Sequence, residues 1–190
     1  MAKSPHRSRI YRFLLDENFP AAPIELARLD KTIELVPLST FDETLLEART
    51  PDWFLYMRAV EEDFDALVGR DFNQTNQEAE MYTLSNMRLS VVTWRGHGDN
   101  DPPVEFGQLL AYMPLVKGRL NAGGPKVIVL PTPRLPAPTN PRERFGELYA
   151  ARGVANEQAR RETWATMAGW LGANSHDVER YAKLIRRARD

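Results

Sequence analysis

The chain has 190 residues, of which 43% are hydrophobic and 27% are charged, so it is long enough to fold around a substantial hydrophobic core. It contains no cysteine, which excludes a disulfide framework and a thiolate metal site. The basic segment at residues 1–9 is not followed by the apolar stretch of a signal peptide, and no apolar run is long enough to cross a bilayer. We therefore expect a cytoplasmic protein with no membrane partner.

The net charge of −1 conceals a segregation of charge along the chain. Residues 1–12 carry four basic side chains and no acidic ones, and residues 142–190 carry ten basic and seven acidic ones. Residues 13–141 instead hold 19 acidic and 11 basic side chains. An acidic body can bind metal ions and basic flanks can bind polyanions, although a solvated charged surface accounts for the same counts.

The first structural element that the sequence predicts is a strand at residues 10–15, which ends in Asp16 and Glu17 and then in a proline turn. Five of its six residues are apolar or aromatic, a pattern typical of a strand buried on both faces. A short helix at residues 21–29 and a second strand at residues 31–38 follow. Strand, helix and strand in this order are the beginning of a βαβ unit.

The same alternation continues to residue 130. Thr50 as N-cap and Pro51 at the first helical position predict a helix that carries Asp52 in its first turn. After it we expect a strand at residues 64–68, a helix at 77–87, a strand at 89–94, a helix at 104–120 and a strand at 126–130. Five strands that alternate with helices predict an α/β fold with a mostly parallel five-stranded sheet flanked by helices.

The C-terminal part of the sequence differs from the body. Five prolines within residues 131–141 predict a stiff, extended linker. Helices are expected after it, at residues 143–152, 156–171 and 177–189, and the last two are amphipathic. We therefore divide the chain into a body at residues 9–131, a proline-rich linker at residues 132–141 and a helical C-terminal extension at residues 142–190.

Acidic residues follow or begin several elements at the same predicted edge of the sheet. Asp16 and Glu17 follow the first strand, Asp71 follows the third, and Asp52 begins a helix. Each one alone is explained by an acidic turn or a helix cap. Together they would repel one another unless a cation bridges them, and oxygen ligands of this kind suit Mg²⁺ or Mn²⁺. Such a metal can promote the hydrolysis of a phosphodiester.

Three segments, FLLDENFP at residues 13–20, TPDW at residues 50–53 and ALVGRDFNQ at residues 66–74, resemble the PIN-like nucleases in their order and spacing. The likeness is to the branch related to VapC-type toxins, and the strands VVTWRG and GGPKVIVLP resemble the closing pair of that family. The resemblance covers residues 9–131 and none of the extension. It implies a PIN-like nuclease domain in the body.

Carried over residue by residue, the resemblance implies that Asp16, Asp52 and Asp71 are catalytic. The metal ligands that it implies are Asp16, Glu17, Asp52, Asp71 and Asn73. Asn73 stands where the family has a fourth acidic residue, and its amide oxygen can still bind a metal. Whether the site holds one metal ion or two is therefore left open.

A second departure from the family is the long connection at residues 38–49. It carries Asp42, Glu43 and Glu47, each of which is an alternative to Asp52.

The expected function is therefore that of a Mg²⁺- or Mn²⁺-dependent endoribonuclease, the toxin of a toxin and antitoxin pair. RNA is the expected substrate, and the candidate protein partners are a cognate antitoxin and a second copy of the chain. The alternative is a catalytically inactive PIN-like module that binds nucleic acid or protein. A phosphotransfer domain with Asp16 as the nucleophile is disfavoured, because no Asp-x-Asp motif follows the strands.

The extension is expected beside the edge that carries the carboxylates. Its final helix is rich in arginine and lysine and would attract the RNA backbone there. An interface with a partner protein is the alternative.

Overall fold

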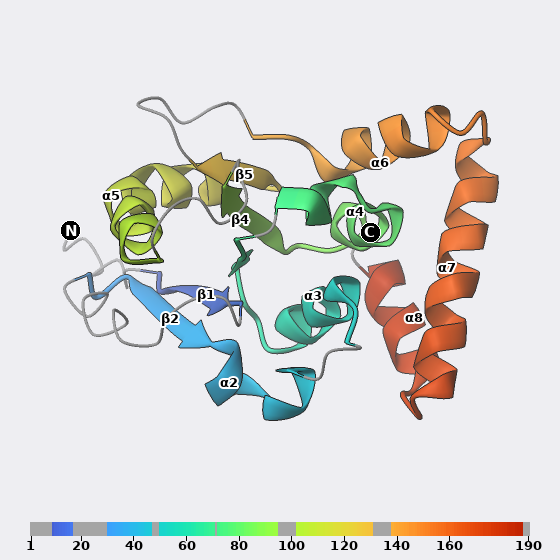
Figure 1. Cartoon of the computed structure of the whole chain (residues 1–190), viewed down its shortest axis with the longest axis horizontal. Coiled ribbons are helices and arrows are strands. Elements are labelled where there is room, and N and C mark those ends of the chain that lie inside the picture. The colour runs from blue at the N-terminus through green and yellow to red at the C-terminus, as the bar shows by residue number, and fades with distance from the viewer. Residues whose placement is uncertain are drawn as a thin grey trace, which may run out of the picture.

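The computed structural model of the chain describes residues 9–16, 30–46, 50–70, 72–94, 102–130 and 138–187. Its centre is a sheet of five parallel strands in the order β2-β1-β3-β4-β5 (Figure 1). The strands are β1 (Tyr11–Leu15), β2 (Ile33–Pro37), β3 (Ala66–Val68), β4 (Ser90–Trp94) and β5 (Val127–Leu130). The expected α/β fold with a parallel five-stranded sheet is thus confirmed.

Strand β1 lies between β2 and β3, so Phe13 pairs with Leu35 on one side and with Ala66 on the other. On the side of β1 opposite to β2, the sheet continues with β3, β4 and β5. These three strands are buried along their whole length, as strands covered by helices on both faces must be. Strand β2 is an edge strand and ends at Pro37, which cannot donate a further ladder hydrogen bond.

The two faces of the sheet are covered by different helices, as the alternation of side chains along each strand requires. On one face, Phe13, Leu15 and Val68 pack against the long helix α5 (Pro102–Asn121). On the other face, Leu14 and Leu67 pack against α3 (Asp52–Glu61) and α4 (Glu78–Ser85). The short helix α2 (Leu38–Phe41) and the 3₁₀ helices η1 (Glu43–Leu46) and η2 (Phe72–Asn76) connect these elements.

The C-terminal helices form a further layer outside α3 and α4 (Figure 1). They are α6 (Pro141–Ala150), α7 (Asn156–Ala173) and α8 (Val178–Arg187). Their buried apolar side chains belong to the same hydrophobic cluster as those of α3 and α4: Phe145, Ala159, Met167, Leu171, Tyr181 and Ile185. The extension therefore shares its hydrophobic core with the body.

The end of the proline-rich segment, which was expected to be a stiff, extended linker, pairs with the sheet. Thr139 forms an antiparallel bridge with Val127, in which each backbone N–H donates to the other carbonyl at 2.9 Å. This pairing is available because Thr139, unlike the prolines around it, retains its N–H. Helix α6 begins at Pro141 rather than at residue 143, since Asn140 caps it by accepting the N–H of Arg142 and proline is favoured at the first helical position.

Other differences in the bounds of elements are of one or two residues. The helix expected to begin at Pro51 has Pro51 as its N-cap and Asp52 as its first residue. The helix expected at residues 21–29 lies outside the described residues. Among the helices that the structure describes, none is both long and apolar enough to cross a membrane.

Candidate active site at the carboxyl edge of the sheet

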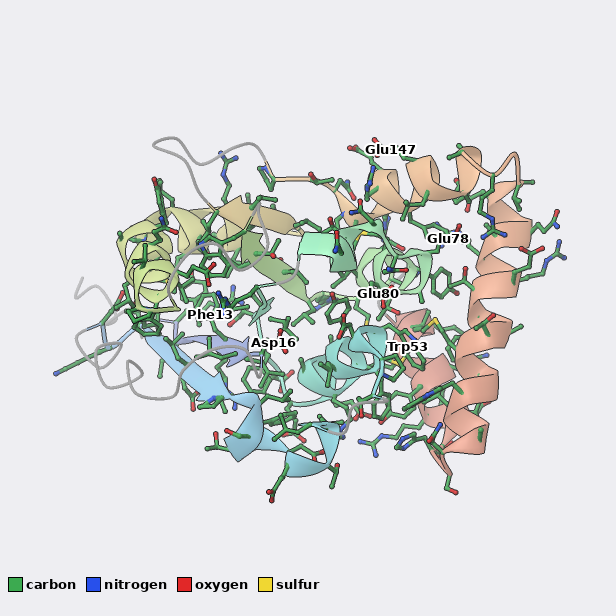
Figure 2. The ribbon with its side chains drawn as sticks, viewed as in Figure 1. Phe13, Asp16, Trp53, Glu78, Glu80 and Glu147 are labelled. Carbon is green, nitrogen blue, oxygen red and sulfur yellow. The ribbon has the colours of Figure 1, made fainter. Side chains whose placement is uncertain are left out.

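Asp16 lies directly after β1, at the carboxyl edge of the sheet (Figure 2). Its backbone N–H donates to the carbonyl of Val68 at 2.9 Å, and only 6% of the residue is exposed. From β1 the chain leads to β2 on one side of the sheet and returns to β3 on the other. In open parallel sheets such a reversal of strand order opens a crevice at the carboxyl ends where ligands bind. Asp16 is the first residue after β1 at this reversal of strand order.

The alternation of side chains places Asp16 on the face that α3 and α4 cover. Leu14 packs on that face and Leu15 on the opposite one, so Asp16, which continues the ladder, is directed back toward α3 and α4. Thr93 in β4 occupies an equivalent position, because its neighbour Val92 packs on the α5 face. The Thr93 hydroxyl oxygen is buried and has no hydrogen-bond partner among the described residues.

Asp52 is the first residue of α3 and lies in its first turn, where the helix dipole stabilises a carboxylate. The other end of α3 lies near the beginning of β1, since the guanidinium of Arg12 donates to the carbonyl of Glu62. Helix α3 therefore runs back along the sheet, and Asp52 lies at the carboxyl edge, on the same face as Asp16. The residue is half-buried.

Glu80, in the first turn of α4, was not singled out from the sequence. It is 8% exposed, and its Oε2 atom has no hydrogen-bond partner among the described residues. Burial, and to a lesser extent the charge of Asp52, raises the pKa of Glu80 to about 7. The sequence signal for this residue is the presence of two acidic residues, Glu78 and Glu80, in the first turn of one helix. Their spacing does not reveal which of the two is buried.

Two of the sequence candidates, Glu17 and Asp71, lie outside the described residues. Asn73 lies in η2 and is exposed.

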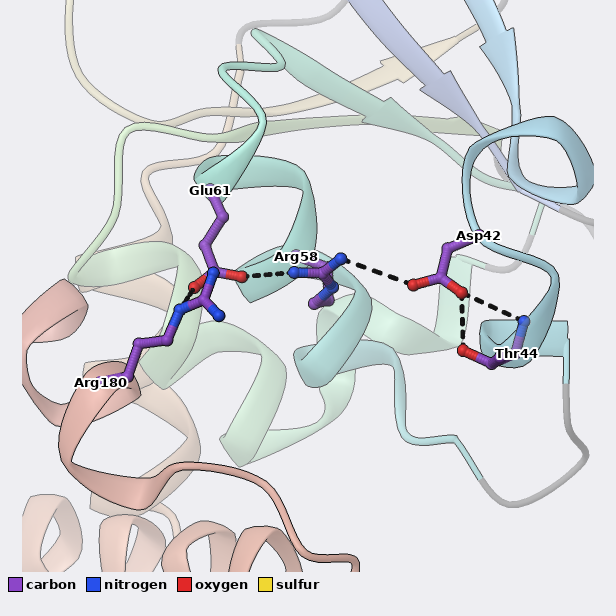
Figure 3. Close-up of polar contacts among 5 residues, drawn as sticks. All are labelled: Asp42, Thr44, Arg58, Glu61 and Arg180. Atoms are coloured by element: carbon purple, nitrogen blue, oxygen red, sulfur yellow. Dashed lines mark hydrogen bonds and ion pairs between the residues drawn. The ribbon is translucent and has the colours of Figure 1, made fainter.

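Of the alternatives to Asp52, Glu43 is exposed in η1 and Glu47 is not described. Asp42 accepts hydrogen bonds from the backbone N–H and the hydroxyl of Thr44, at 3.1 and 2.6 Å, and pairs with Arg58 at 3.5 Å (Figure 3). Asp42 therefore holds η1 against α3, and Asp52 is the better candidate for the helix carboxylate.

Arg70 follows β3 at the same edge and forms an ion pair with Glu105 in the first turn of α5. Glu105 is only 1% exposed, so the charge of Arg70 compensates a buried carboxylate. This pair anchors the loop after β3, the loop that leads to Asp71.

A cleft of about 570 Å³ lies beside Asp52, between the first turns of α3 and α4 and helix α7. Its lining includes Pro51 and Trp53 from the start of α3, Glu78 and Glu80 from α4, and Thr163 from α7. Arg152, which precedes α7, lines this cleft and forms two ion pairs. One is with Glu78 of α4, and the other is with Glu162 of α7 at 3.1 Å. The C-terminal extension thus forms one wall of a cleft whose other walls carry acidic residues.

The donor atoms at this edge are oxygens, from Asp16, Asp52, Glu80 and Thr93, which suit Mg²⁺ or Mn²⁺ rather than a softer metal. Within the described residues, no group of three or more Asp, Glu or His side chains is arranged so that it could hold a metal ion. A site with two protein carboxylates and several waters is also compatible with Mg²⁺.

Comparison with known proteins does not identify a relative. No protein-family model matches the chain, and neither does any curated protein or solved structure. The function is therefore argued from the carboxyl edge itself.

Proposed function

We propose that the chain is a metal-dependent endoribonuclease with a PIN-like active site at the carboxyl edge of its sheet. The observation that carries this proposal is the position of Asp16, a nearly buried carboxylate at the reversal of strand order. A carboxylate is seldom buried unless a cation or hydrogen bonds compensate its charge. Asp52 on the same face and edge supplies a second carboxylate, and Asp71 is proposed as the third.

In this proposal Asp16, Asp52 and Asp71 hold Mg²⁺ or Mn²⁺, with Glu17 and Asn73 as further candidate ligands. The ion would supply a Lewis acid and lower the pKa of a bound water for attack on the phosphodiester. The Arg70–Glu105 pair fixes the chain directly after β3, next to Asp71 in the sequence. The preference for RNA and the toxin role rest on the resemblance to VapC-related proteins.

The extension carries cations of the kind that bind an RNA backbone. Helix α8 has exposed Arg180, Lys183 and Arg186, but Arg180 pairs with Glu61 at the end of α3 opposite to Asp52, so Arg180 does not lie at the carboxyl edge, where the last helix was expected. Exposed cations gain affinity for a phosphate backbone by releasing counterions, so this affinity falls as salt is raised. We therefore expect RNA binding by the full-length protein to weaken with increasing ionic strength.

The decisive experiment is a cleavage assay on mixed RNA with Mn²⁺, with and without a chelator. We expect cleavage that the chelator abolishes, and a rate at least roughly 100-fold lower for Asp16→Asn. Glu143→Gln, at an exposed position of α6, is the matched control and should cleave like the wild type. Circular dichroism should show that both variants are folded.

Two results would contradict the proposal: cleavage that persists with the chelator, or an Asp16→Asn variant that cleaves at the wild-type rate. RNA binding without any cleavage would instead favour the inactive binding module.

A further inference from the structure

A cavity of about 330 Å³ lies at the amino edge of the sheet, opposite to the edge that carries Asp16. It is lined by the turn between α5 and β5, at residues 123–126, and by residues 138–140 and Arg142 at the beginning of α6. Lys126 directly precedes β5, whereas Asp16 directly follows β1, so in a parallel sheet the two residues lie at opposite edges. The cavity is therefore separate from the proposed active site.

The lining of this cavity contains two basic side chains, Lys126 and Arg142, and no acidic side chain. Neither of the two forms an ion pair with any residue that the structure describes; their recorded hydrogen bonds go to backbone carbonyls. Burial, and to a lesser extent the charge of Arg119, lowers the pKa of the Lys126 ammonium, as expected of a cation that has no anionic partner. The cavity is thus positively charged.

Lys126 is held in place but retains a free donor. An ammonium group has three N–H donors, and that of Lys126 donates to the carbonyls of Gly123 and Gly124, to the second at 3.0 Å. Both glycines have positive φ values, 75° and 71°, which glycine adopts without strain, and the turn that they form presents the two carbonyls to Lys126. These carbonyls carry only partial charges, so they orient the ammonium without neutralising it.

Arg142 and Asn140 add further donors to the lining. The Nε of Arg142 donates to the carbonyl of Ser85 at 2.9 Å, which leaves the four N–H groups of its two terminal nitrogens without a partner among the described residues. The Oδ1 of Asn140 accepts the backbone N–H of Arg142 at 2.9 Å, so the amide nitrogen of Asn140 provides the donors of that side chain. The polar side chains of the cavity therefore suit an anion that accepts several hydrogen bonds.

We propose that this cavity binds a phosphate group, held by Lys126, Arg142 and Asn140. The planar guanidinium of arginine matches a phosphate with two parallel hydrogen bonds, and the ammonium of lysine binds it as a point charge. A volume of about 330 Å³ leaves room for water beside the phosphate, since one water molecule takes about 30 Å³ in the liquid. The phosphate belongs either to an RNA backbone or to a free phosphate compound, and the inference does not depend on cleavage at the carboxyl edge.

Both basic side chains also lie at the C-terminal ends of helices. Arg142 binds the carbonyl of Ser85 at the end of α4, and Lys126 follows the end of α5, where the helix dipole favours a positive charge. This capping role stabilises the fold without any ligand. The test therefore measures binding rather than stability.

The full-length protein is titrated with inorganic phosphate, and binding is followed by calorimetry and by the amide NMR signals of residues 123–126, which should shift. We expect Lys126→Gln and Arg142→Gln each to bind phosphate at least about tenfold more weakly than the wild type. Arg142→Lys, which retains the charge but not the planar group, should lose less. Arg161→Gln, at an exposed position of α7, is the matched control and should bind phosphate like the wild type. Circular dichroism checks that every variant is folded.

A second titration, with a single-stranded oligouridylate in the presence of a chelator, identifies the source of the phosphate. RNA binding that Lys126→Gln weakens and that inorganic phosphate inhibits assigns the site to the RNA backbone. Unchanged RNA binding by a variant that has lost phosphate binding assigns it to a free phosphate compound.

The proposal is overturned if the wild type binds no inorganic phosphate, or if the double variant Lys126→Gln with Arg142→Gln binds it as tightly as the wild type. Neither result affects the ribonuclease proposal, which is tested by Mn²⁺-dependent cleavage and by Asp16→Asn at the opposite edge of the sheet.

Discussion

The indole ring of Trp53 meets that of Trp170 edge to face, with the ring centroids 5.2 Å apart and the planes at 81°. Trp53 follows Asp52 in the first turn of α3, and Trp170 comes from the last turns of α7. More than a hundred residues separate the two in the sequence. The C-terminal extension thus supports the turn that carries a candidate catalytic carboxylate.

Trp170→Ala is expected to lower the free energy of unfolding by about 2 kcal/mol, because it removes a large, half-buried ring from the contact between α3 and α7. Trp170→Phe retains an aromatic edge and should cost less. Urea unfolding followed by circular dichroism measures both variants. An alanine variant as stable as the wild type would show that α7 does not support α3.

Glu80 should make stability depend on pH. Its pKa is raised from 4.5 in the unfolded chain to about 7 in the folded protein, so the folded state binds more protons between these values. The free energy of unfolding of the metal-free protein should therefore fall as the pH rises from about 4.5 to about 7, by about 3 kcal/mol in total. It should not fall further above that range on account of Glu80.

Glu80→Gln removes this titration, so its free energy of unfolding should exceed that of the metal-free wild type at pH 8 and approach it at pH 5. Urea unfolding at the two pH values is the measurement. An equal pH dependence in both proteins would show that Glu80 ionises normally.

The pair Arg70–Glu105 allows a test of the loop after β3. Arg70→Ala leaves the carboxylate of Glu105, which is 1% exposed, without its guanidinium, and should lower the free energy of unfolding by about 3 kcal/mol. The double variant Arg70→Leu with Glu105→Leu should recover most of the loss, because no charge then remains buried. A double variant as unstable as Arg70→Ala would show that the loss of stability does not come from the unpaired charge of Glu105.

Glu61, at the end of α3, joins the body to the last helix. Its side chain is 8% exposed and contacts Arg58 at 2.7 Å and Arg180 of α8 at 2.5 Å (Figure 3). Glu61→Gln should lower the free energy of unfolding by about 1–2 kcal/mol, because Arg180 then loses this anion and Arg58 retains only Asp42. Arg180→Ala should cost about 0.5 kcal/mol, since the Arg180 side chain is largely exposed and Arg58 still pairs with Glu61. Equal losses would contradict this order.

The positions of the strands could be predicted from the sequence, because their signals are local. The apolar run that became β1 and the β-branched run that became β4 each bury both faces, and short apolar runs bounded by turn residues are typical of buried strands. The spacing of Met167 and Leu171 likewise predicted the buried face of α7. The edge on which Asp16 and Asp52 lie follows from the parallel sheet, and hence from the alternation of strands and helices.

Only the tertiary structure decided which acidic residues are buried and what the extension covers. Glu78 and Glu80 lie two positions apart in the same turn, yet one is paired with Arg152 and the other leaves a buried oxygen unpartnered. Their difference depends on residues that are distant in the sequence, Arg152 before α7 and the first turn of α3. Asp42 was an alternative to Asp52 in the sequence, and the structure shows that Thr44 and Arg58 hold Asp42. Periodicity reports that a face is buried, but the partner of each charge depends on contacts between elements that are distant in the chain.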